Sequence, residues 1–352
     1  MKHLAKDLAF SAPTDKDSHL ELLSDDVSSS QTWDNGVTVI IPTYKRPEGL
    51  ARALSSILSQ GPCGRLVEIL ITDNDPEGSA RAYIEHMAQT VSVPLLYIHA
   101  PQPGVSNARN TAMAKARGRY IAWLDDDQEA GADWIKSYLL AVERYDAALV
   151  FCPSPAEVEG CGKDNAFLIE FFSRSGAAEN GVISEFHGCG NSFMDLKKCK
   201  LPSPIFDPKA NESGGEDDIL FTYIQAQNVV TAWTQDSYVT EYVPAWRATA
   251  NYVRKRSFGF GQGPSRICAN PDNFNILGLI KWTMIGILQM LVYGPLALLL
   301  SAIGHSKALH FQCKACEGAG KVFWQTCFQQ KLYGATALKL KAKLQSKLKS
   351  ES

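Results

Sequence analysis

Three consecutive aspartates, Asp125 to Asp127, follow a short apolar run in the stretch YIAWLDDD. Adjacent carboxylates repel one another and raise each other's pKa, so this cluster is unfavourable unless a positive charge lies among them. Asp125 and Asp127 can share one hard cation, because Mg²⁺ or Mn²⁺ commonly binds one or two carboxylates and completes its shell with phosphate oxygens and water. We therefore predict that Asp125 and Asp127 bind such a metal together with a nucleoside diphosphate, and that Asp126 contacts the substrate.

Polar residues also follow two other apolar runs. VTVII precedes the group from Pro42 to Arg46, and LVEILIT precedes Asp73, which could accept a hydrogen bond from a base. In open parallel sheets the ligand lies beyond the carboxyl ends of the strands, so these groups and the three aspartates are expected at one edge. Each group alone would more often be a turn or a helix cap. Arg109 could face a phosphate or a base, although a surface arginine is the plainer explanation.

Strands and helices alternate in the part of the chain that carries these residues. Apolar runs predict strands at 37–41, 66–73, 94–100 and 119–127, and helical spacing predicts helices at 46–60, 78–88 and 104–118. This alternation indicates an α/β fold with a mostly parallel central sheet flanked by helices. We expect three parts: a loosely ordered polar arm at residues 1–36, the α/β domain at 37–270, and a C-terminal segment at 271–352.

The order of three motifs resembles a known family. The runs VTVIIPTYKRPEGLARALSSIL, VEILITDND and PGVSNARNTAMAKARGRYIAWLDDD are similar to those of family 2 glycosyltransferases, which are inverting enzymes with the GT-A fold, and the likeness covers about residues 36–262. It implies that Asp73 contacts the base and that Asp125 and Asp127 form the metal-binding DXD motif. The family often has a second acid where this chain has Asn74, so the base identity stays open. The residues expected at the base and ribose are Pro42, Thr43, Tyr44 and Arg46.

A second acidic cluster, Glu216 to Asp218, lies in SGGEDDILF. Acids in the first turn of a helix are ordinary, because they complement the helix dipole. Inverting sugar transfer also needs a carboxylate that takes the proton from the acceptor hydroxyl. The segment resembles the family's ED motif, which implies that Asp217 is the base and that Glu216 or Asp218 supports it. The sequence does not decide which of the three acids acts.

Two further segments carry candidate substrate contacts. EFHGCGNSF contains small residues that would let a sugar or acceptor approach the backbone, and the resemblance points to Gly188, Gly190 and Asn191. In NYVRKRSFGFGQG, Arg254 and Arg256 fall where family members place a basic motif that closes over the diphosphate. A solvated basic face is an equal alternative for these two arginines.

Residues 282–303 carry no formal charge and are about as long as a membrane span. Gly294 and Pro295 interrupt the run, so a kink or turn is expected there. Because basic residues lie on both flanks, a single crossing would place one flank on the wrong side. We favour a hairpin or a steeply embedded segment, anchored by residues of about 276–303, that returns to the cytoplasmic face of the inner membrane. The alternative is a buried helix of a soluble domain.

The tail ALKLKAKLQSKLKS supports a membrane location. Leu340, Leu344 and Leu348 recur every four residues among lysines, which suits a helix lying on anionic lipid. The whole chain has 352 residues and a net charge of -2, so nucleic acid is not an expected partner. Its nine cysteines form no paired framework, and the first 36 residues hold no apolar signal segment, which favours a reducing cytosolic environment.

These features together predict a metal-dependent inverting glycosyltransferase of the hexosyl or N-acetylhexosaminyl class. Its donor would be a nucleotide sugar, UDP-linked, and its acceptor a hydroxyl of a lipid-linked saccharide or polysaccharide in the assembly of a bacterial surface polysaccharide. A nucleotidyltransferase is one alternative, but IPTYKRPEG lacks the glycine-rich phosphate loop that such enzymes use. A membrane-anchored module that binds nucleotide sugars without transferring them is the other. The sequence does not identify the sugar, the acceptor, the linkage or the oligomeric state.

Overall fold

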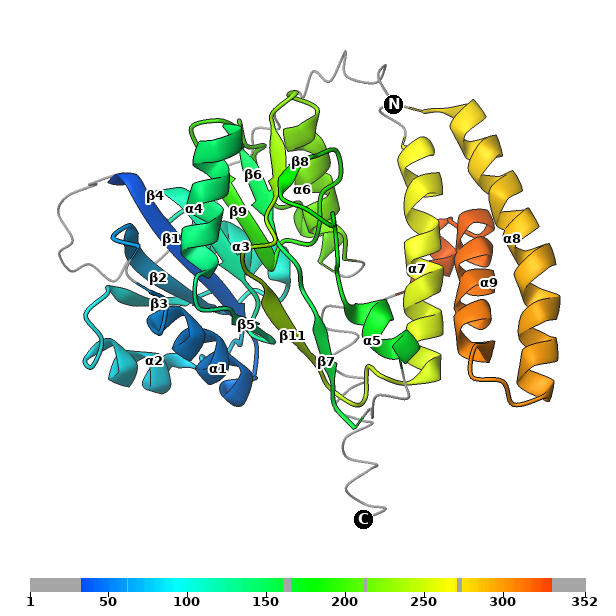
Figure 1. Cartoon of the computed structure of the whole chain (residues 1–352), viewed down its shortest axis with the longest axis horizontal. Helices are drawn as coiled ribbons and strands as arrows, with labels where there is room; N and C mark the ends of the chain where they lie inside the picture. Colours follow the sequence, from blue (N-terminus) through cyan, green and yellow to red (C-terminus); the bar gives the residue numbers. More distant parts are fainter. Residues whose placement is uncertain (1–32, 62, 161–165, 212–213, 271–273, 331–352) are drawn as a thin grey trace.

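The computed structural model describes residues 33–330, apart from 62, 161–165, 212–213 and 271–273. These described residues form a sheet region and, beside it, a layer of long helices (Figure 1). The α/β architecture expected from the sequence is confirmed. Most of the predicted arm at 1–36 and the basic tail at 331–352 lie outside the described residues, and the predicted domain boundaries at 36 and 270 stay predictions.

The larger sheet is mixed and mostly parallel. Within the described residues it has eight strands in the order β3-β2-β1-β4-β9-β6-β10-β8. The pairs β1-β2, β2-β3 and β1-β4 are parallel, and β9 lies antiparallel between β4 and β6. The strands are β1 (Trp33–Thr43), β2 (Leu66–Asp73), β3 (Leu95–His99), β4 (Gly118–Leu124), β6 (Leu149–Phe151), β8 (Gly181–Ile183), β9 (Asn191–Asp195) and β10 (Thr231–Trp233).

Both faces of the parallel strands are buried, which explains their nearly continuous apolar sequences. In β1, Val39 and Ile41 belong to the apolar cluster on one face of the sheet, and Ile40 belongs to the cluster on the other. β2 has the predicted bounds, whereas β1 begins at Trp33 rather than Val37. Trp33 pairs with Gly118 before a register shift, and the polar residues at this shift hide the start of the strand from a hydrophobic pattern.

Six helices and a small second sheet complete the described sheet region. α1 and α4 lie near one face of the large sheet and α3 near the other (Figure 1). The small sheet, with the order β5-β11-β7, begins directly after the three aspartates. Its strands are β5 (Gln128–Ala130), β7 (Ala156–Val158) and β11 (Val239–Val243), and the helices are α1 (Pro47–Leu58), α2 (Arg81–Ala88), α3 (Val105–Met113), α4 (Trp134–Tyr145), α5 (Ala166–Phe172) and α6 (Glu216–Gln225).

The helical layer consists of α7 (Ala250–Cys268), α8 (Ile276–Ala302) and α9 (Ala308–Val322), and α9 packs against both of the others. Gly261 and Gly320 allow α7 and α9 to approach closely, because a Cβ atom at either position would overlap a carbonyl oxygen of the other helix. α7 also contacts the sheet region through α5, where Phe172 stacks on Tyr252. The layer is therefore packed against the sheet region through aromatic side chains.

The predicted turn at Gly294 and Pro295 is wrong. α8 continues through Pro295, and the chain reverses at residues 303–307 before α9 returns alongside it. Proline removes one backbone hydrogen bond and crowds the preceding turn, but it does not stop a helix when good helix formers continue on both sides. The leucine-rich stretches around Pro295 supply this continuity. A helical hairpin is present, but it is formed by α8 and α9 and not within residues 276–303, where it was predicted.

Candidate active site

The carboxylate of Asp126 gathers the polar residues that follow β1. It accepts hydrogen bonds from the Thr43 hydroxyl at 2.9 Å, the Tyr44 backbone N–H at 3.2 Å and Arg46 Nη1 at 2.6 Å. Parallel pairing of β1 with β4 places the ends of these strands side by side, as a parallel sheet requires. Pro42 is buried within β1 just before this group. The structure therefore brings the first two predicted groups together.

Asp127 lies between two arginines. Its Oδ2 accepts from Arg46 Nη1 at 3.0 Å and from Arg247 Nη1 at 3.2 Å. Arg247 follows β11, stacks on Trp246 with its guanidinium carbon 5.3 Å from the ring centre, and has a buried Nε without a hydrogen-bond partner. Sequence reasoning missed Arg247. Trp246 and Arg247 form an aromatic and basic pair a few residues before the predicted basic segment, and this pattern could have indicated Arg247.

Arg109 joins the two acidic clusters. Its Nη1 donates to Glu216 Oε1 at 2.7 Å, and its Nη2 donates to Asp125 Oδ1 at 3.2 Å. Only 4% of Arg109 is exposed, so the plainer explanation of a surface arginine is wrong. Removing such a buried cation would leave two acids without their partner, which is strongly unfavourable. Acids that are distant in sequence therefore belong to one site.

Asp217 lies near the glycine-rich segment before β9. Its Oδ2 accepts from the Cys189 backbone N–H at 3.1 Å. A Cβ at Gly188 would meet that oxygen at 3.5 Å, and a Cβ at Gly190 would overlap the carboxylate of Asp125. These small residues allow the backbone to pass between the two acidic clusters. Gly188 and Gly190 thus lie at the carboxylates, and their predicted contact with a sugar or acceptor stays a prediction.

Two predicted contacts have partners within the protein. Asp73 is fully buried, and its carboxylate accepts from the backbone N–H groups of Asp75 and Ala80 and from the Tyr97 hydroxyl. Asn191 is also buried, and its Oδ1 accepts from the Tyr138 hydroxyl at 2.6 Å. Both side chains hold the fold together in this conformation. Their predicted contacts with base and acceptor stay predictions that would require these side chains to become accessible.

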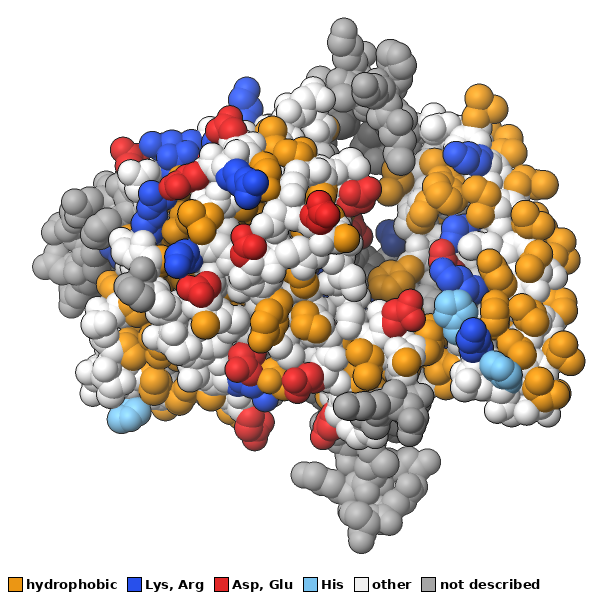
Figure 2. Space-filling view, viewed as in Figure 1, with side chains coloured by type: hydrophobic (Ala, Val, Ile, Leu, Met, Phe, Trp, Pro, Cys, Tyr) orange, Lys and Arg blue, Asp and Glu red, His pale blue; other side chains and the backbone are white. Residues whose placement is uncertain are grey.

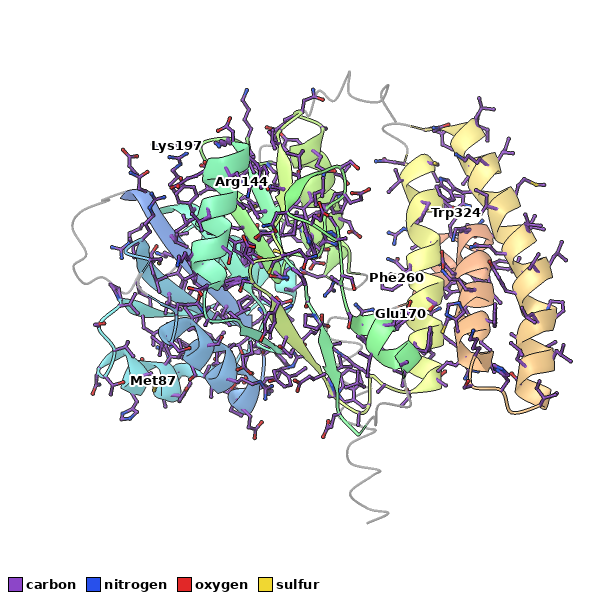
Figure 3. The ribbon with its side chains drawn as sticks, in the orientation of Figure 1. Met87, Arg144, Glu170, Lys197, Phe260 and Trp324 are labelled. Carbon is purple, nitrogen blue, oxygen red and sulfur yellow. The ribbon has the colours of Figure 1, made fainter. Side chains whose placement is uncertain are left out.

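Arg254 and Arg256 point to different neighbours. Arg254 donates to Gln312 of α9 at 3.2 Å. The guanidinium of Arg256 lies over the rings of Phe172 and Phe260. Figure 3 places Phe260 on the side of α7 that faces α5 and the sheet region. Their predicted contact with a diphosphate stays a prediction, while Arg247 already touches the acidic cluster.

Burial and neighbouring charges shift the acids in different directions. Burial raises the pKa of Asp125 to about 6; Asp127 and Asp126 add to the rise, while Arg109 opposes it. Because 35% of the Asp125 side chain is exposed, it lies in a recess rather than in the core. Burial would also raise the pKa of Asp127, but Arg46 and Arg247 outweigh it and lower the pKa. Asp127 is thus held ionised more firmly than Asp125.

Asp218 has the most strongly shifted pKa of the second cluster. Surrounding protein and the carboxylates of Asp217 and Glu216 raise the pKa of Asp218 to about 7, although its side chain is exposed at the surface. Glu216 is buried, and this burial raises its pKa despite the pairing with Arg109. Crowded carboxylates in a recess are a common feature of sites that transfer protons.

Hard oxygen donors and an excess of negative charge fit a divalent cation at the first cluster. Asp125 and Asp127 offer the carboxylates that Mg²⁺ and Mn²⁺ prefer. Around them, the described carboxylates of both clusters and of Glu241 outnumber the guanidinium groups of Arg46, Arg109, Arg174 and Arg247. Within the described residues, no three His, Cys, Asp or Glu side chains are grouped as a metal site. Asp125 and Asp127 would therefore supply two ligands, and substrate and water the others.

A space separates the sheet region from part of the helical layer. Figure 2 shows a hollow there, with acidic side chains at its edge. α6, which begins with Glu216, lies on the sheet side of this hollow, and α7 lies on the other (Figure 1). A substrate that reaches the acids from this side would lie next to the helical layer.

Comparison with known proteins gives consistent matches. The model of the family described as "Glycosyl transferase family 2" matches residues 38–194. The succinoglycan biosynthesis protein ExoM of Rhizobium meliloti is 30% identical over 234 residues, which is 66% of this chain and 75% of that protein. The match with ExoM extends well beyond the stretch that the family model covers.

A second relative and one solved structure are also similar. The Escherichia coli enzyme WfgD, a UDP-Glc:alpha-D-GlcNAc-diphosphoundecaprenol beta-1,3-glucosyltransferase, is 32% identical over 91 residues, or 26% of this chain and 34% of WfgD. The crystal structure of S. aureus TarS 1-349 in complex with UDP has 14% sequence identity and a TM-score of 0.49, and the likeness covers 82% of this chain and 90% of that chain.

Proposed function

Because this chain belongs to glycosyl transferase family 2, we propose that it transfers a sugar from a UDP-sugar to a hydroxyl of a lipid-linked saccharide, with inversion at the anomeric carbon. The observation that carries this proposal is the contact of Arg109 with both Asp125 and Glu216. It joins a cluster suited to a diphosphate with a cluster suited to proton transfer. Membership of this family argues against a nucleotidyltransferase, and a donor screen separates sugar transfer from a silent binding module.

The donor would bind at the ends of β1 and β4. Thr43, Tyr44 and Arg46 surround Asp126, so the predicted residues for base and ribose are adjacent to the acids. Mg²⁺ or Mn²⁺ held by Asp125 and Asp127 would stabilise the charge on the departing diphosphate. Arg247 and Arg46 can contact phosphate oxygens, because guanidinium groups match their geometry. Arg247 is the candidate for the basic group that was expected at Arg254 and Arg256.

Asp217 would act as the general base. It accepts the proton of the acceptor hydroxyl as the oxygen attacks the anomeric carbon from the face opposite the diphosphate. A bond forms between the acceptor oxygen and the anomeric carbon, and the bond from that carbon to the diphosphate oxygen breaks. UDP leaves with the electron pair. Cys189 holds Asp217 through its backbone N–H, and Glu216 is engaged with Arg109, which supports the assignment of the base to Asp217.

A donor screen tests the proposed function. The full chain is incubated with Mn²⁺ and a panel of nucleotide sugars, with and without lipid-linked acceptors, and free nucleoside diphosphate and sugar products are measured by mass spectrometry. We expect slow UDP release from one UDP-sugar and faster release with an accepted lipid-linked saccharide. Binding of a nucleotide sugar without any release, even in the presence of acceptors, would favour the silent module instead.

Names of relatives support an acceptor in the membrane. ExoM acts in succinoglycan biosynthesis, and WfgD uses a diphosphoundecaprenol-linked sugar. In this chain, α8 is, among the described residues, the one helix long and apolar enough to cross a membrane by length and composition. Figure 2 shows apolar side chains gathered over the edge of the molecule that α8 forms. The large exposed ones include Leu277, Ile280, Met284, Leu288, Leu291, Val292, Leu298 and Leu299.

We infer that α8 lies along the membrane surface instead of crossing it. α9 packs along α8 and carries Lys314, Glu317 and Lys321, which form ion pairs at 3.3 and 2.8 Å. If α8 crossed the bilayer with this packing kept, these charges would enter the hydrocarbon, at about 2.5 to 3.5 kcal/mol for each such residue near the centre. In the surface orientation only the outer apolar face of α8 meets lipid. Both ends of α8 then stay at the cytoplasmic face, as the basic flanks suggest.

Labelling of new cysteines tests this orientation. Arg266→Cys lies before α8 and Ser306→Cys lies after it, and both positions are exposed. A membrane-impermeant maleimide should label both variants in inverted membrane vesicles and neither in intact spheroplasts, with labelled peptides identified by mass spectrometry. Labelling of Ser306→Cys from outside, together with labelling of Arg266→Cys from inside, would show that α8 crosses the membrane. The exposed native Cys327 provides an internal comparison.

A further inference from the structure

Arg174 is a half-buried arginine that no motif of the sequence indicates. It follows α5, and its backbone is fixed by two hydrogen bonds with Ser154, at 2.8 and 2.9 Å. The preceding Ser173 accepts from the backbone N–H of Ala156 in β7 at 2.9 Å. The start of the Arg174 side chain is therefore held firmly against the small sheet.

The side chain of Arg174 pairs with β11, the strand whose backbone is bonded to Asp127. Its Nη1 donates to Glu241 Oε2 at 2.6 Å, and the Glu241 side chain is 8% exposed. Glu241 lies in β11 opposite Gln128 of β5, and the next residue, Tyr242, donates its backbone N–H to the Asp127 carbonyl at 2.8 Å. The position of Arg174 is thus tied to the backbone that presents Asp127.

The other end of the guanidinium lies near the second cluster, on the other side of Gly188. A Cβ at Gly188 would meet Arg174 Nη2 at 3.4 Å and Asp217 Oδ2 at 3.5 Å, so both groups lie against the same glycine. The next residue, Cys189, donates its backbone N–H to that oxygen of Asp217. Asp217 stabilises the charged form of Arg174 and helps to raise its pKa, after the larger effect of Glu241, which is the expected sign for a nearby carboxylate.

We propose that Arg174 is a positioning residue for the general base: its guanidinium, fixed by Glu241 and lying beside Gly188, keeps the carboxylate of Asp217 at a set place relative to Asp127. This inference rests on the proposed function, because it takes Asp217 as the base. In this arrangement one connected unit runs from the Asp127 backbone through β11 and Glu241 to Arg174, and the charge of Arg174 acts on Asp217 across Gly188. Precise placement of this kind matters, because a displacement of about 1 Å can lower a rate about 10²-fold.

A plain structural ion pair is the competing explanation, and the chain offers a matched control for it. Arg119 donates to Asp195 at 2.8 and 2.6 Å, and the Asp195 side chain is fully buried. This pair lies at the start of β4, whereas the aspartates follow its end. Arg119→Gln should therefore lower the melting temperature without changing the rate of the chemical step in the folded protein.

The test is a double-mutant cycle on the full chain. The measured quantity is the rate of UDP release, in the presence of Mn²⁺, from the donor that the nucleotide-sugar screen identifies. We expect Arg174→Gln to lower turnover about 10- to 100-fold with UDP affinity retained, and Arg174→Lys to recover part of it. In the Asp217→Asn background, Arg174→Gln should have no further effect, because groups that act as a unit are not additive. Fully additive losses, or unchanged turnover in Arg174→Gln, would overturn the inference.

A second pair of variants separates positioning from folding. Arg174→Gln leaves Glu241 buried without its partner, so it should lower the melting temperature. Adding Glu241→Gln should restore much of that stability but not the turnover. Recovery of both in the double variant would reduce Arg174 to a structural role. If Asp217→Asn itself keeps full turnover, the assignment of Asp217 as the base fails. Additive losses in the cycle would instead contradict only the role of Arg174.

Discussion

Asp217→Asn is expected to lower the turnover of sugar transfer by about 10²- to 10⁴-fold, the usual contribution of a general base. The amide cannot accept the proton of the acceptor hydroxyl, but it is close in size and can still accept the hydrogen bond from the Cys189 backbone N–H. The donor-side residues around Asp126 stay in place. Steady-state assays of sugar transfer should therefore show a large loss of turnover. Calorimetry should show a UDP affinity within about twofold of wild type.

The neighbouring acids provide the controls for this prediction. Asp218 is exposed and has a pKa raised to about 7 by surrounding protein and adjacent carboxylates, so a large part of it is protonated at neutral pH. Asp218→Asn should therefore change turnover much less than Asp217→Asn. Its charge appears as the pH rises through 7, so any effect of the variant should grow above that pH. A larger loss in Asp218→Asn than in Asp217→Asn would move the role of base to Asp218.

The parallel half of the sheet was predictable because its strands, and the polar residues at their carboxyl ends, form a clear local pattern in the sequence. Continuous apolar runs mark strands buried on both faces, and the polar residues that follow must meet at one edge. That reasoning placed Thr43 and Arg46 beside Asp126, and the structure shows these contacts. The start of β1 at Trp33 was not predictable, because the register shift there interrupts the apolar pattern.

Contacts between distant segments of the site could not be predicted from the sequence. Arg109 was a candidate, but its contact with Glu216 depends on how α3 and α6 pack, across 107 positions of chain. Arg247 and Arg174 lie in segments without periodic pattern, and each owes its place to β11. A family motif marks residues that recur in a fixed order, whereas these arginines are defined by the strand pairing around them.

Side-chain direction explains a second limit. Gly190 and Asn191 are neighbours in a run of small residues, and both were expected to contact substrate. Gly190 lies in the turn before β9, where its backbone passes the Asp125 carboxylate. Asn191 is the first residue of β9, and its amide lies in the core with Tyr138. Composition alone could not tell which of the two faces the site.

The loss of Asp125 should also cause a large loss of activity. Asp125→Ala removes one of the two carboxylates proposed to hold the metal and leaves Arg109 with Glu216 as its remaining partner. We expect Mn²⁺-dependent turnover to fall about 10²- to 10³-fold or more, as when one stabilising charge of a transition state is lost. Mn²⁺ should also no longer strengthen UDP binding, which calorimetry with and without the ion measures independently of activity.

Asp133→Ala is the matched control for this variant, because Asp133 is exposed and its side chain does not cap α4. It should leave both turnover and the effect of Mn²⁺ unchanged. Asp127→Ala tests the second ligand, and it removes one partner each from Arg46 and Arg247, although Arg46 keeps its bond to Asp126. It should weaken Mn²⁺-dependent UDP binding while both arginines remain able to contact phosphate. Unchanged turnover and unchanged Mn²⁺ dependence in Asp125→Ala would rule out the proposed metal role, whatever the outcome at Asp217.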